Sequence, residues 1–281
     1  KSQPKANTQR INSSNNLLTP RNLQATTEFV VTVTVGGTNE NHAILAGFAS
    51  YNCTIFTVEN TEMNVKSDGQ DDALYQPETF SKNFTNHAAG TYNIKYSSNA
   101  TFTSVSGCFG GCETIIAVKF TSFQGNPSQL NDMFRSCTSL LSVDFGDEFD
   151  TSSVERMQNV FNGCENLISV NFGANFKTTN VKYMDFFFNR CLSLTSLSIS
   201  FDTRSVIKMD SMFRDCKSLS YLNLGTDFDT SEVTEMGYLF ANCESLKELD
   251  LSEYHFNTSK VNLMNRMFDS CFNLTSIHSY Y

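Results

Sequence analysis

The stretch MDSMFRDCKSLSYLNLGTDFDTSEV, residues 209–233, decides the fold, because its spacing of Met, Phe, Cys and Leu recurs along the chain. Aligning the copies on cysteine gives seven, at intervals of 25, 27, 27, 25, 27 and 28 residues. A reactive site is needed once, whereas a core position is needed once in every structural unit. The recurrence therefore predicts stacked repeats with buried cysteines rather than a catalytic thiol. The aligned residues are Cys112, Cys137, Cys164, Cys191, Cys216, Cys243 and Cys271.

Each copy changes its apolar periodicity partway along. From Val154 to Cys164 the apolar steps are three, three, one and three, which predicts one buried stripe on a short helix. At Val170 and Phe172 the step becomes two, which predicts a short strand with one buried face. The Thr and Ser residues before each Val suit helix N-caps. Neither element can bury its apolar side alone, so the units must stack.

These units resemble the leucine-rich repeats of the BspA-like class, with the pattern M-x-x-M-F-x-x-C-x-x-L-x-x-L-x-L-S-x-F-(D/N)-T-S-x-V over residues 107–278. The first copy departs from the pattern, with Leu130 in place of Met and Pro127 in place of Val. The resemblance implies a right-handed α/β solenoid of surface or secreted proteins, used for adhesion and protein contact rather than catalysis. We therefore expect an α/β leucine-rich-repeat solenoid of about seven 25–28-residue repeats over residues 107–281.

A different pattern precedes the repeats. Residues 1–25 are polar and predict a flexible arm. Residues 26–106 predict a small all-β, sandwich-like domain, with alternating or β-rich runs at 27–35, 52–58, 91–96 and 100–105. Within it, NHAAGTYNIKYSSN (86–99) resembles the end of a PKD-like, immunoglobulin-type domain, although the W-G-D-G turn of that family is missing.

The composition limits the partners. A net charge of -9 and only 20 Lys and Arg argue against a nucleic-acid partner. No run approaches 18 apolar residues, so we expect no membrane span in this chain. The chain starts at Lys1 without an apolar signal segment, which we interpret as prior processing. Abundant Asn, Ser and Thr with only 17% charged residues favour an extracellular or cell-surface, secreted location.

No pattern for catalysis, metal or cofactor binding emerges. The four His residues are scattered, and the close pair Cys108 and Cys112 has no companion pair to complete a zinc site. No G-x-G-x-x-G, P-loop or G-x-S-x-G motif occurs. We therefore expect no cofactor and no enzyme activity.

Two modifications are open predictions. Cys53 and Cys108 lie outside the regular ladder and would pair as a disulfide in an oxidising compartment, although Cys108 also suits the core. Six N-x-S/T sequons occur, close to the chance number for this composition. Asn83 and Asn99, in expected loops, are the best glycosylation candidates.

Three surfaces are candidates for protein contact. The strand face presents the residues five and seven after each Cys, the open last repeat exposes an apolar end, and the strand at 27–35 suits donation to a neighbour's sheet. We predict a self-assembling, filament-forming subunit in head-to-tail contact with itself; the alternative is a monomeric adhesin that binds another surface protein on its strand face. The ligand-face candidates are Asp144, Asn171, Ser198, Tyr221, Asn223, Glu248 and Asp250; the assembly end comprises Phe272, Leu274, Ile277, Tyr280 and Tyr281; the donated strand presents Phe29, Val31, Val33 and Val35.

Overall fold

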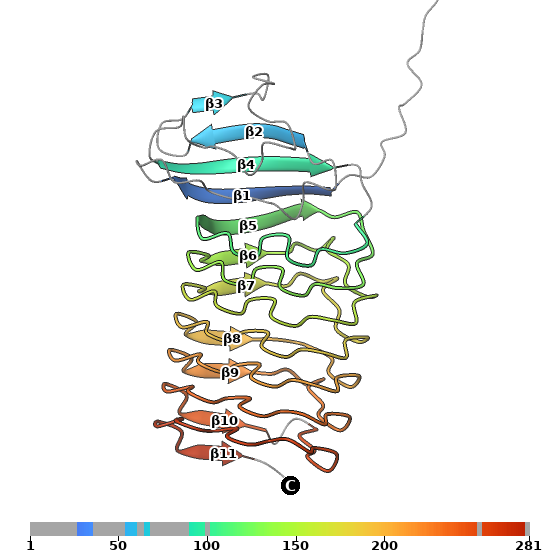
Figure 1. Ribbon diagram of the computed structural model, residues 1–281, viewed down its shortest axis with the longest axis vertical. Coiled ribbons are helices and arrows are strands. Elements are labelled where there is room, and N and C mark those ends of the chain that lie inside the picture. Colours follow the sequence, from blue (N-terminus) through green and yellow to red (C-terminus); the bar gives the residue numbers. More distant parts are fainter. Residues whose placement is uncertain are drawn as a thin grey trace, which may run out of the picture.

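The chain folds as a β-solenoid of about six turns (Figure 1). The structure is a computed structural model that describes residues 27–35, 54–60, 65–67, 90–98, 102–251 and 255–278. The described residues form eleven strands and no helix. The strands are β1 (Thr27–Val35), β2 (Thr54–Asn60), β3 (Val65–Ser67), β4 (Gly90–Ser98), β5 (Ile115–Ser122), β6 (Ser142–Asp144), β7 (Ser169–Asn171), β8 (Ser196–Ser198), β9 (Tyr221–Asn223), β10 (Glu248–Asp250) and β11 (Ser276–His278).

The prediction of an α/β solenoid with a short helix in every repeat is wrong. The segment before each Cys is a series of tight turns in which the fifth and first residues before the Cys have positive φ. Asp132 and Ser136 show this, with φ of 58° and 60°. A left-handed residue at every fourth position interrupts helical dihedral angles before a second helical turn can form. The three-residue apolar spacing therefore reflects successive turns rather than a helix.

Backbone hydrogen bonds explain why the turns persist. The Phe134 N–H donates to the Val160 carbonyl of the following coil (2.9 Å), whereas the Cys137 N–H donates to the Phe134 carbonyl of its own coil (3.1 Å). Along each turn segment, amides that donate to the next coil alternate with amides that donate within their own coil. About half of the amides therefore join neighbouring coils. In an α-helix, the amides after the first turn would instead have donated to carbonyls of their own segment.

The strands run along one side of the stack. The strand order of the main sheet is β3-β2-β4-β1-β5-β6-β7, and β8-β9 and β10-β11 form two further pairs. The three-residue solenoid strands pair in parallel, but β1 pairs with β5 antiparallel. Residues 26–106 are predicted above as a small all-β, sandwich-like domain, and their described strands extend the solenoid's sheet.

The predicted N-terminal strands have mixed outcomes. The structure has strands at Thr27–Val35, Thr54–Asn60 and Gly90–Ser98, close to the predicted 27–35, 52–58 and 91–96. The strand predicted at 100–105 is absent from the described residues 102–105, where Phe102 forms only an isolated bridge with Gly125. The predicted arm at residues 1–25 lies outside the described residues.

The core consists of ladders in which the same residue type is stacked in successive coils. The Phe three residues before each Cys forms one such ladder, with ring centroids 4.9–5.9 Å apart and interplanar angles of 1–12°. Such offset stacking adds to the hydrophobic gain from burial. The ladder comprises Phe109, Phe134, Phe161, Phe188, Phe213, Phe240 and Phe268.

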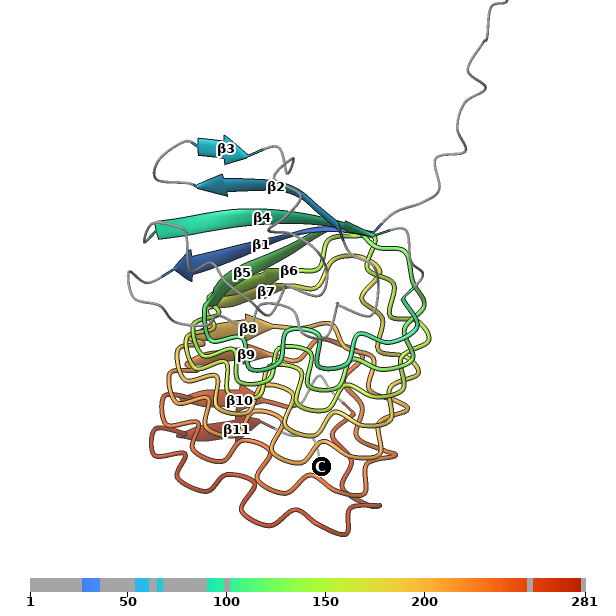
Figure 2. The same cartoon turned by 45° about the horizontal axis from the view of Figure 1, so that its top comes forward.

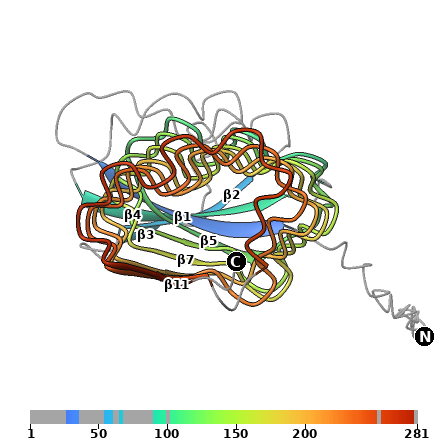
Figure 3. The same ribbon diagram turned by 90° about the horizontal axis from the view of Figure 1, so that it is seen from below.

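The two ends of the stack differ. When the molecule is tilted, β1–β4 rise beyond β5 at the N-terminal end (Figure 2). Viewed from below, the coils superpose as one ring, and β1, β4 and β2 cross it behind the coils (Figure 3). The N-terminal end of the core is thus covered by strands, while β11 forms the last rung at the other end.

Candidate functional site

The cysteine ladder joins the coils. Each ladder thiol after the first donates to the carbonyl of the Phe in the preceding coil, as Cys216 does to Phe188 at 3.2 Å. The same carbonyl also accepts the N–H of the Cys in its own coil. Burial raises the pKa of Cys216 to about 12, so the thiol stays protonated and acts as a donor. The predicted core role of the ladder cysteines is confirmed for Cys112 to Cys243, which are buried, whereas Cys271 is half-buried.

The threonine of each D-T-S turn also joins coils, which the sequence reasoning missed. The Thr203 hydroxyl donates to the Asp229 carbonyl of the next coil (2.7 Å) and accepts from the Asp229 N–H (2.7 Å). The turn itself is held by the Asp, since the Asp202 carboxylate accepts from the Arg204 N–H (3.2 Å). The predicted helix N-cap role of these threonines is therefore wrong. The four buried members are Thr151, Thr178, Thr203 and Thr230.

The candidate ligand face lies on β6–β10, and several of its side chains are already engaged. The residue seven after the Cys accepts a hydrogen bond from a glycine N–H two residues on: Asp144 from Gly146 at 3.0 Å and Asn223 from Gly225 at 2.9 Å. Asn171 makes the same bond to the Gly173 N–H at 3.2 Å and also donates to Asp144 at 2.8 Å. These residues shape the turn after each strand.

The outward positions five after the Cys are more open. Tyr221 is 56% exposed on β9, and Glu248 is exposed on β10. Ser198 and Asp250, seven after the Cys, are exposed as well. The predicted ligand-face residues therefore share one side of the molecule, and Tyr221 is the large aromatic side chain among them.

The candidate assembly end is apolar, and part of it is exposed. Phe272 is 78% and Ile277 44% exposed, while Leu274 is half-buried. Their environment differs from that of inner coils: Leu249, the counterpart of Ile277 in β10, is 1% exposed. Tyr280 and Tyr281 lie outside the described residues.

Two further exposed residues of the last coil were not singled out from the sequence. Leu263 and Met264 are 51% and 52% exposed, whereas Met236, the counterpart of Met264 one coil earlier, is fully buried. The repeat pattern held the signal for Met264, which stands at a core position of the repeat and has no further coil over it among the described residues.

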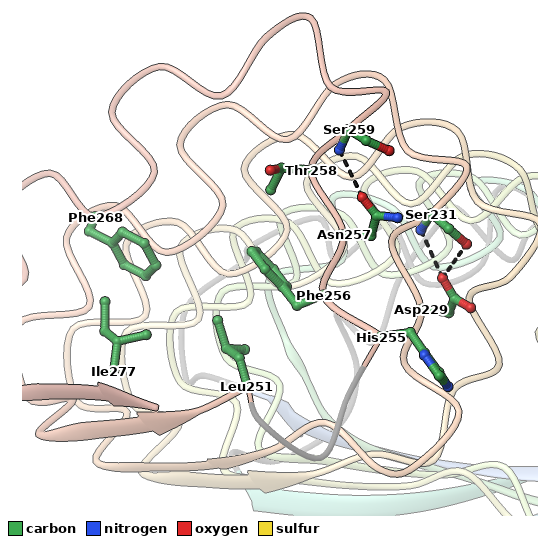
Figure 4. Close-up of a pocket in the computed structure, with 10 residues that line it drawn as sticks. All are labelled: Asp229, Ser231, Leu251, His255, Phe256, Asn257, Thr258, Ser259, Phe268 and Ile277. Atoms are coloured by element: carbon green, nitrogen blue, oxygen red, sulfur yellow. Dashed lines mark hydrogen bonds between the residues drawn. The ribbon is translucent and has the colours of Figure 1, made fainter. Parts of the chain in front are cut away.

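A hollow of about 540 Å³ opens beside this last coil (Figure 4). Leu251, Phe256, Phe268 and Ile277 line its apolar side. On the other side, polar groups of the turn residues hydrogen-bond to one another. For example, the Ser259 N–H donates to Asn257 Oδ1 (2.9 Å). The polar lining is therefore largely engaged within the chain.

A pair of carboxylates lies on the turn side of the stack. Asp185 and Asp210 occupy the same position in adjacent coils and help to line a groove of about 580 Å³. Burial, reinforced by the neighbouring charge of Asp210, raises the pKa of Asp185 to about 6. Lys208 pairs with Glu235 at 2.7 Å beside them. Among the described residues, no group of three or more His, Cys, Asp or Glu could hold a metal ion.

The candidate donated strand is engaged within its own chain. The backbone of β1 pairs with β4 on one edge and with β5 on the other. Phe29 lies opposite Tyr96 and Phe120, and Val31, Val33 and Val35 also lie within these ladders. This strand therefore has no free edge to add to a neighbour's sheet.

The remaining predicted sites fall largely outside the described residues. Cys108 is buried, but Cys53 is not among the described residues, so their disulfide stays a prediction. Asn83 and Asn99 also lie outside them. No described helix has the length and apolarity that crossing a membrane requires.

The coils and their ladders define the chain as a β-solenoid repeat protein. It belongs to the family described as "Mycoplasma protein of unknown function, DUF285", whose model matches residues 128–226 and 199–280, together more than half of the chain. No curated protein and no solved structure matches the chain. The family match covers the repeats alone, so it supports a repeat family but gives no support to the BspA-like name or to a PKD-like N-terminal domain.

Proposed function

We propose that this protein is a non-enzymatic, extracellular or cell-surface subunit that acts through protein–protein contacts and assembles through its C-terminal coil. The observation that carries this proposal is the apolar surface of that coil. Ile277, Met264 and Leu263 are 44–52% exposed. Contiguous exposed apolar surface rimmed by polar groups is typical of interaction sites.

Phe272 adds a feature that chain position alone does not explain. It stands one residue after Cys271, a place occupied by Lys217 and Glu244 in the two preceding coils. In the other coils this position is exposed or half-buried, and Leu192 occupies it in one of them. At 78% exposure it is suited to insertion into a partner surface.

The alternative, a monomeric adhesin that binds a surface protein on its strand face, has one supporting observation. Tyr221 is 56% exposed on that face and is flanked by Glu248 on the next strand. Tyrosine is enriched at binding hot spots. Most neighbouring side chains on this face are small, and Asp144, Asn171 and Asn223 hold turns. We therefore favour the C-terminal coil.

The two proposals are separated by sedimentation velocity and electron microscopy of the full chain over a wide concentration range. We expect association that Phe272→Glu weakens by tenfold or more, about 1.4 kcal/mol. This variant carries the residue that Glu244 supplies one coil earlier, so folding should be retained, and circular dichroism checks this. The matched control is Tyr221→Ser, because serine occupies that position in β6–β8.

Association that is unaffected by Phe272→Glu but abolished by Tyr221→Ser would move the contact to the strand face. Uniform single particles at all concentrations would contradict self-assembly and leave the adhesin as the better proposal.

A further inference from the structure

The sheet of the solenoid is interrupted between β7 and β8. β6 pairs with β7 and β8 pairs with β9, but β7 and β8 share no ladder in the described part of the chain. Figures 1 and 2 show the wider interval between these two strands. On the turn side the same two coils stay joined, since the Phe161 N–H donates to the Phe187 carbonyl (2.8 Å). The two coils are therefore joined on one side of the stack and open on the other.

The interruption lies where the chain is two residues shorter. The last residue of the strand and the buried turn threonine are seven positions apart after β6, β7 and β9, but five apart after β8, from Ser198 to Thr203. The missing residues include the glycine that has positive φ in the other three connections, which is Gly146, Gly173 or Gly225. A coil that lacks two residues at this corner cannot follow the path of the coil before it.

A hollow of about 630 Å³ opens at the interruption, lined by Val170 and Phe172 from the β7 coil and by Ser198 from β8. Val170 and Phe172 stand at core positions of the repeat but are only partly buried. Their counterparts in the preceding coil, Val143 and Phe145, are 2% and 0% exposed. Because the β7 coil has a coil on each side, the interruption is what exposes these two residues.

A second interruption, between β9 and β10, differs in this respect. The equivalent core residues there, Leu222 and Leu224, are 8% and 0% exposed. Access to the apolar interior is therefore a property of the interruption between β7 and β8.

The strand edges at the hollow carry backbone groups without ladder partners. In paired coils, the N–H eight residues after the Cys donates to the next coil, as Phe145 does to Asn171 and Ile199 to Asn223, both at 2.9 Å. The equivalent Phe172 N–H has no backbone acceptor within the described ranges. N–H groups alternate between the two edges of a strand, so four of them face the interruption. They belong to Val170, Phe172, Ser196 and Ser198.

An extended polypeptide fits this arrangement best. Its backbone offers donors and acceptors on both edges with a rise of about 3.3 Å per residue, which is the spacing of the two strand edges that it would meet. Addition of an extended segment to exposed strand edges is an established mode of protein recognition. Inward side chains of such a segment would contact Val170 and Phe172, and outward ones would lie beside Asn171 and Ser198, so apolar and polar residues should alternate along it.

The charges around the hollow favour a basic neighbour to that segment. Three carboxylates line the hollow, those of Asp147, Asp202 and Asp227, together with one ammonium group, that of Lys177. Asp202 is paired with Arg204, whereas Asp227 is exposed. A Lys or Arg beside the inserted residues would therefore meet a net negative rim.

We propose that the interruption between β7 and β8 is a docking site for an extended segment of another protein, which inserts as a strand between them. The segment alternates apolar and polar residues and carries a Lys or Arg next to the inserted part. This contact is separate from the C-terminal coil, so it adds a second binding surface and does not depend on the proposed self-assembly.

Hydrogen exchange of the full chain tests the site, in the Phe272→Glu variant so that association through the C-terminal coil does not interfere. The probe is a synthetic peptide that joins two lysines to LISVNFG, the sequence of residues 167–173. In the free chain, the four amides at the interruption should exchange at least about tenfold faster than the paired Ile199 amide. With saturating probe they should slow by about tenfold, while Ile199 stays unchanged.

Two further arms separate strand insertion from simple apolar contact. A probe methylated on two adjacent backbone nitrogens keeps its side chains but lacks two N–H donors, and its affinity should be about tenfold lower. Asp227→Lys changes an exposed rim residue, so folding should be retained, and it should weaken binding of the parent probe by about two- to fivefold.

Four amides that exchange as slowly as Ile199 in the free chain would show that β7 and β8 pair, and would overturn the inference. Equal binding of the methylated probe, or unchanged exchange at about 1 mM parent probe, would overturn it as well. Protection of the Ile277 amide instead would place the probe beside β11 and not at the interruption. Self-assembly of the unmodified chain is measured separately by sedimentation, so failure of either proposal leaves the other standing.

Discussion

Replacing Thr203 by valine tests whether the D-T-S threonines hold adjacent coils together. The Thr203 side chain is fully buried, and its hydroxyl both donates to and accepts from the backbone of Asp229 at 2.7 Å. Valine has nearly the same shape but no hydroxyl, so the Asp229 N–H and carbonyl lose this partner. An unsatisfied buried group costs about 1–3 kcal/mol. We expect the free energy of unfolding to fall by about 2–4 kcal/mol.

The last coil provides a matched control. Thr258 occupies the same place in its turn but is exposed and has no following coil among the described residues. Thr258→Val should change the free energy of unfolding by less than about 0.5 kcal/mol. Thr203→Ser retains the hydroxyl and should cost about 1 kcal/mol for the lost methyl group.

Urea unfolding followed by circular dichroism provides the measurement, with the slope m used to check that the variants unfold in the same manner. Equal effects of Thr203→Val and Thr258→Val would refute the reasoning, because the two sites differ in the presence of a following coil.

Three further predictions concern the ladder, the turns and the buried acid. With iodoacetamide at pH 8, Cys271 should be alkylated in the folded chain while Cys243, fully buried and with its pKa raised well above the usual value, should remain unmodified by peptide mass analysis. Gly173→Ala should lower the melting temperature much more than Gly111→Ala: both glycines have positive φ, but an added Cβ at Gly173 would collide with the Gly146 carbonyl, whereas nothing lies within 4 Å at Gly111. The pKa of Asp185 is raised to about 6, so the folded chain binds the proton of this carboxyl more tightly than the unfolded chain does. The free energy of unfolding should therefore fall by about 2–3 kcal/mol as the pH rises from 4 to 6. Asp185→Asn should reduce this loss in urea titrations, and an unchanged pH dependence would contradict the assignment.

The repeating sequence correctly predicted what lies inside the molecule. The spacing around Cys216 identified Phe213 and Leu219 as core residues, and both are fully buried. The alternation after each Leu located the short solenoid strands, as at Tyr221–Asn223. These predictions succeeded because burial depends on which side chains are apolar and how often they recur.

The same spacing failed to distinguish a helix from a series of turns. Apolar steps of three and four residues suit both, and single Ser, Asp or Arg residues give no clear signal that positions such as Ser211 and Asp215 will adopt positive φ. Local preference favours right-handed angles for such residues. Pairing with the next coil, 24–28 residues further on, outweighs that preference.

Some properties of the candidate sites could be predicted from the sequence, and others could not. The sequence identified Phe272 and Ile277 as an exposed apolar end and Tyr221 as part of the strand face, because the repeat fixes each position relative to the core. The antiparallel pairing of β1 with β5 was not predicted, since it joins residues more than 80 positions apart. That pairing removed the donated-strand surface from consideration.

The sequence by itself determined the period of the stack and the membership of its core, because these follow from the order of apolar and polar side chains. Tertiary structure decided the conformation of the turns, the inter-coil role of Thr203 and the inter-coil hydrogen bonds of the turn amides. Each depends on hydrogen bonds between segments of different coils, whose partners are fixed only when the coils are stacked.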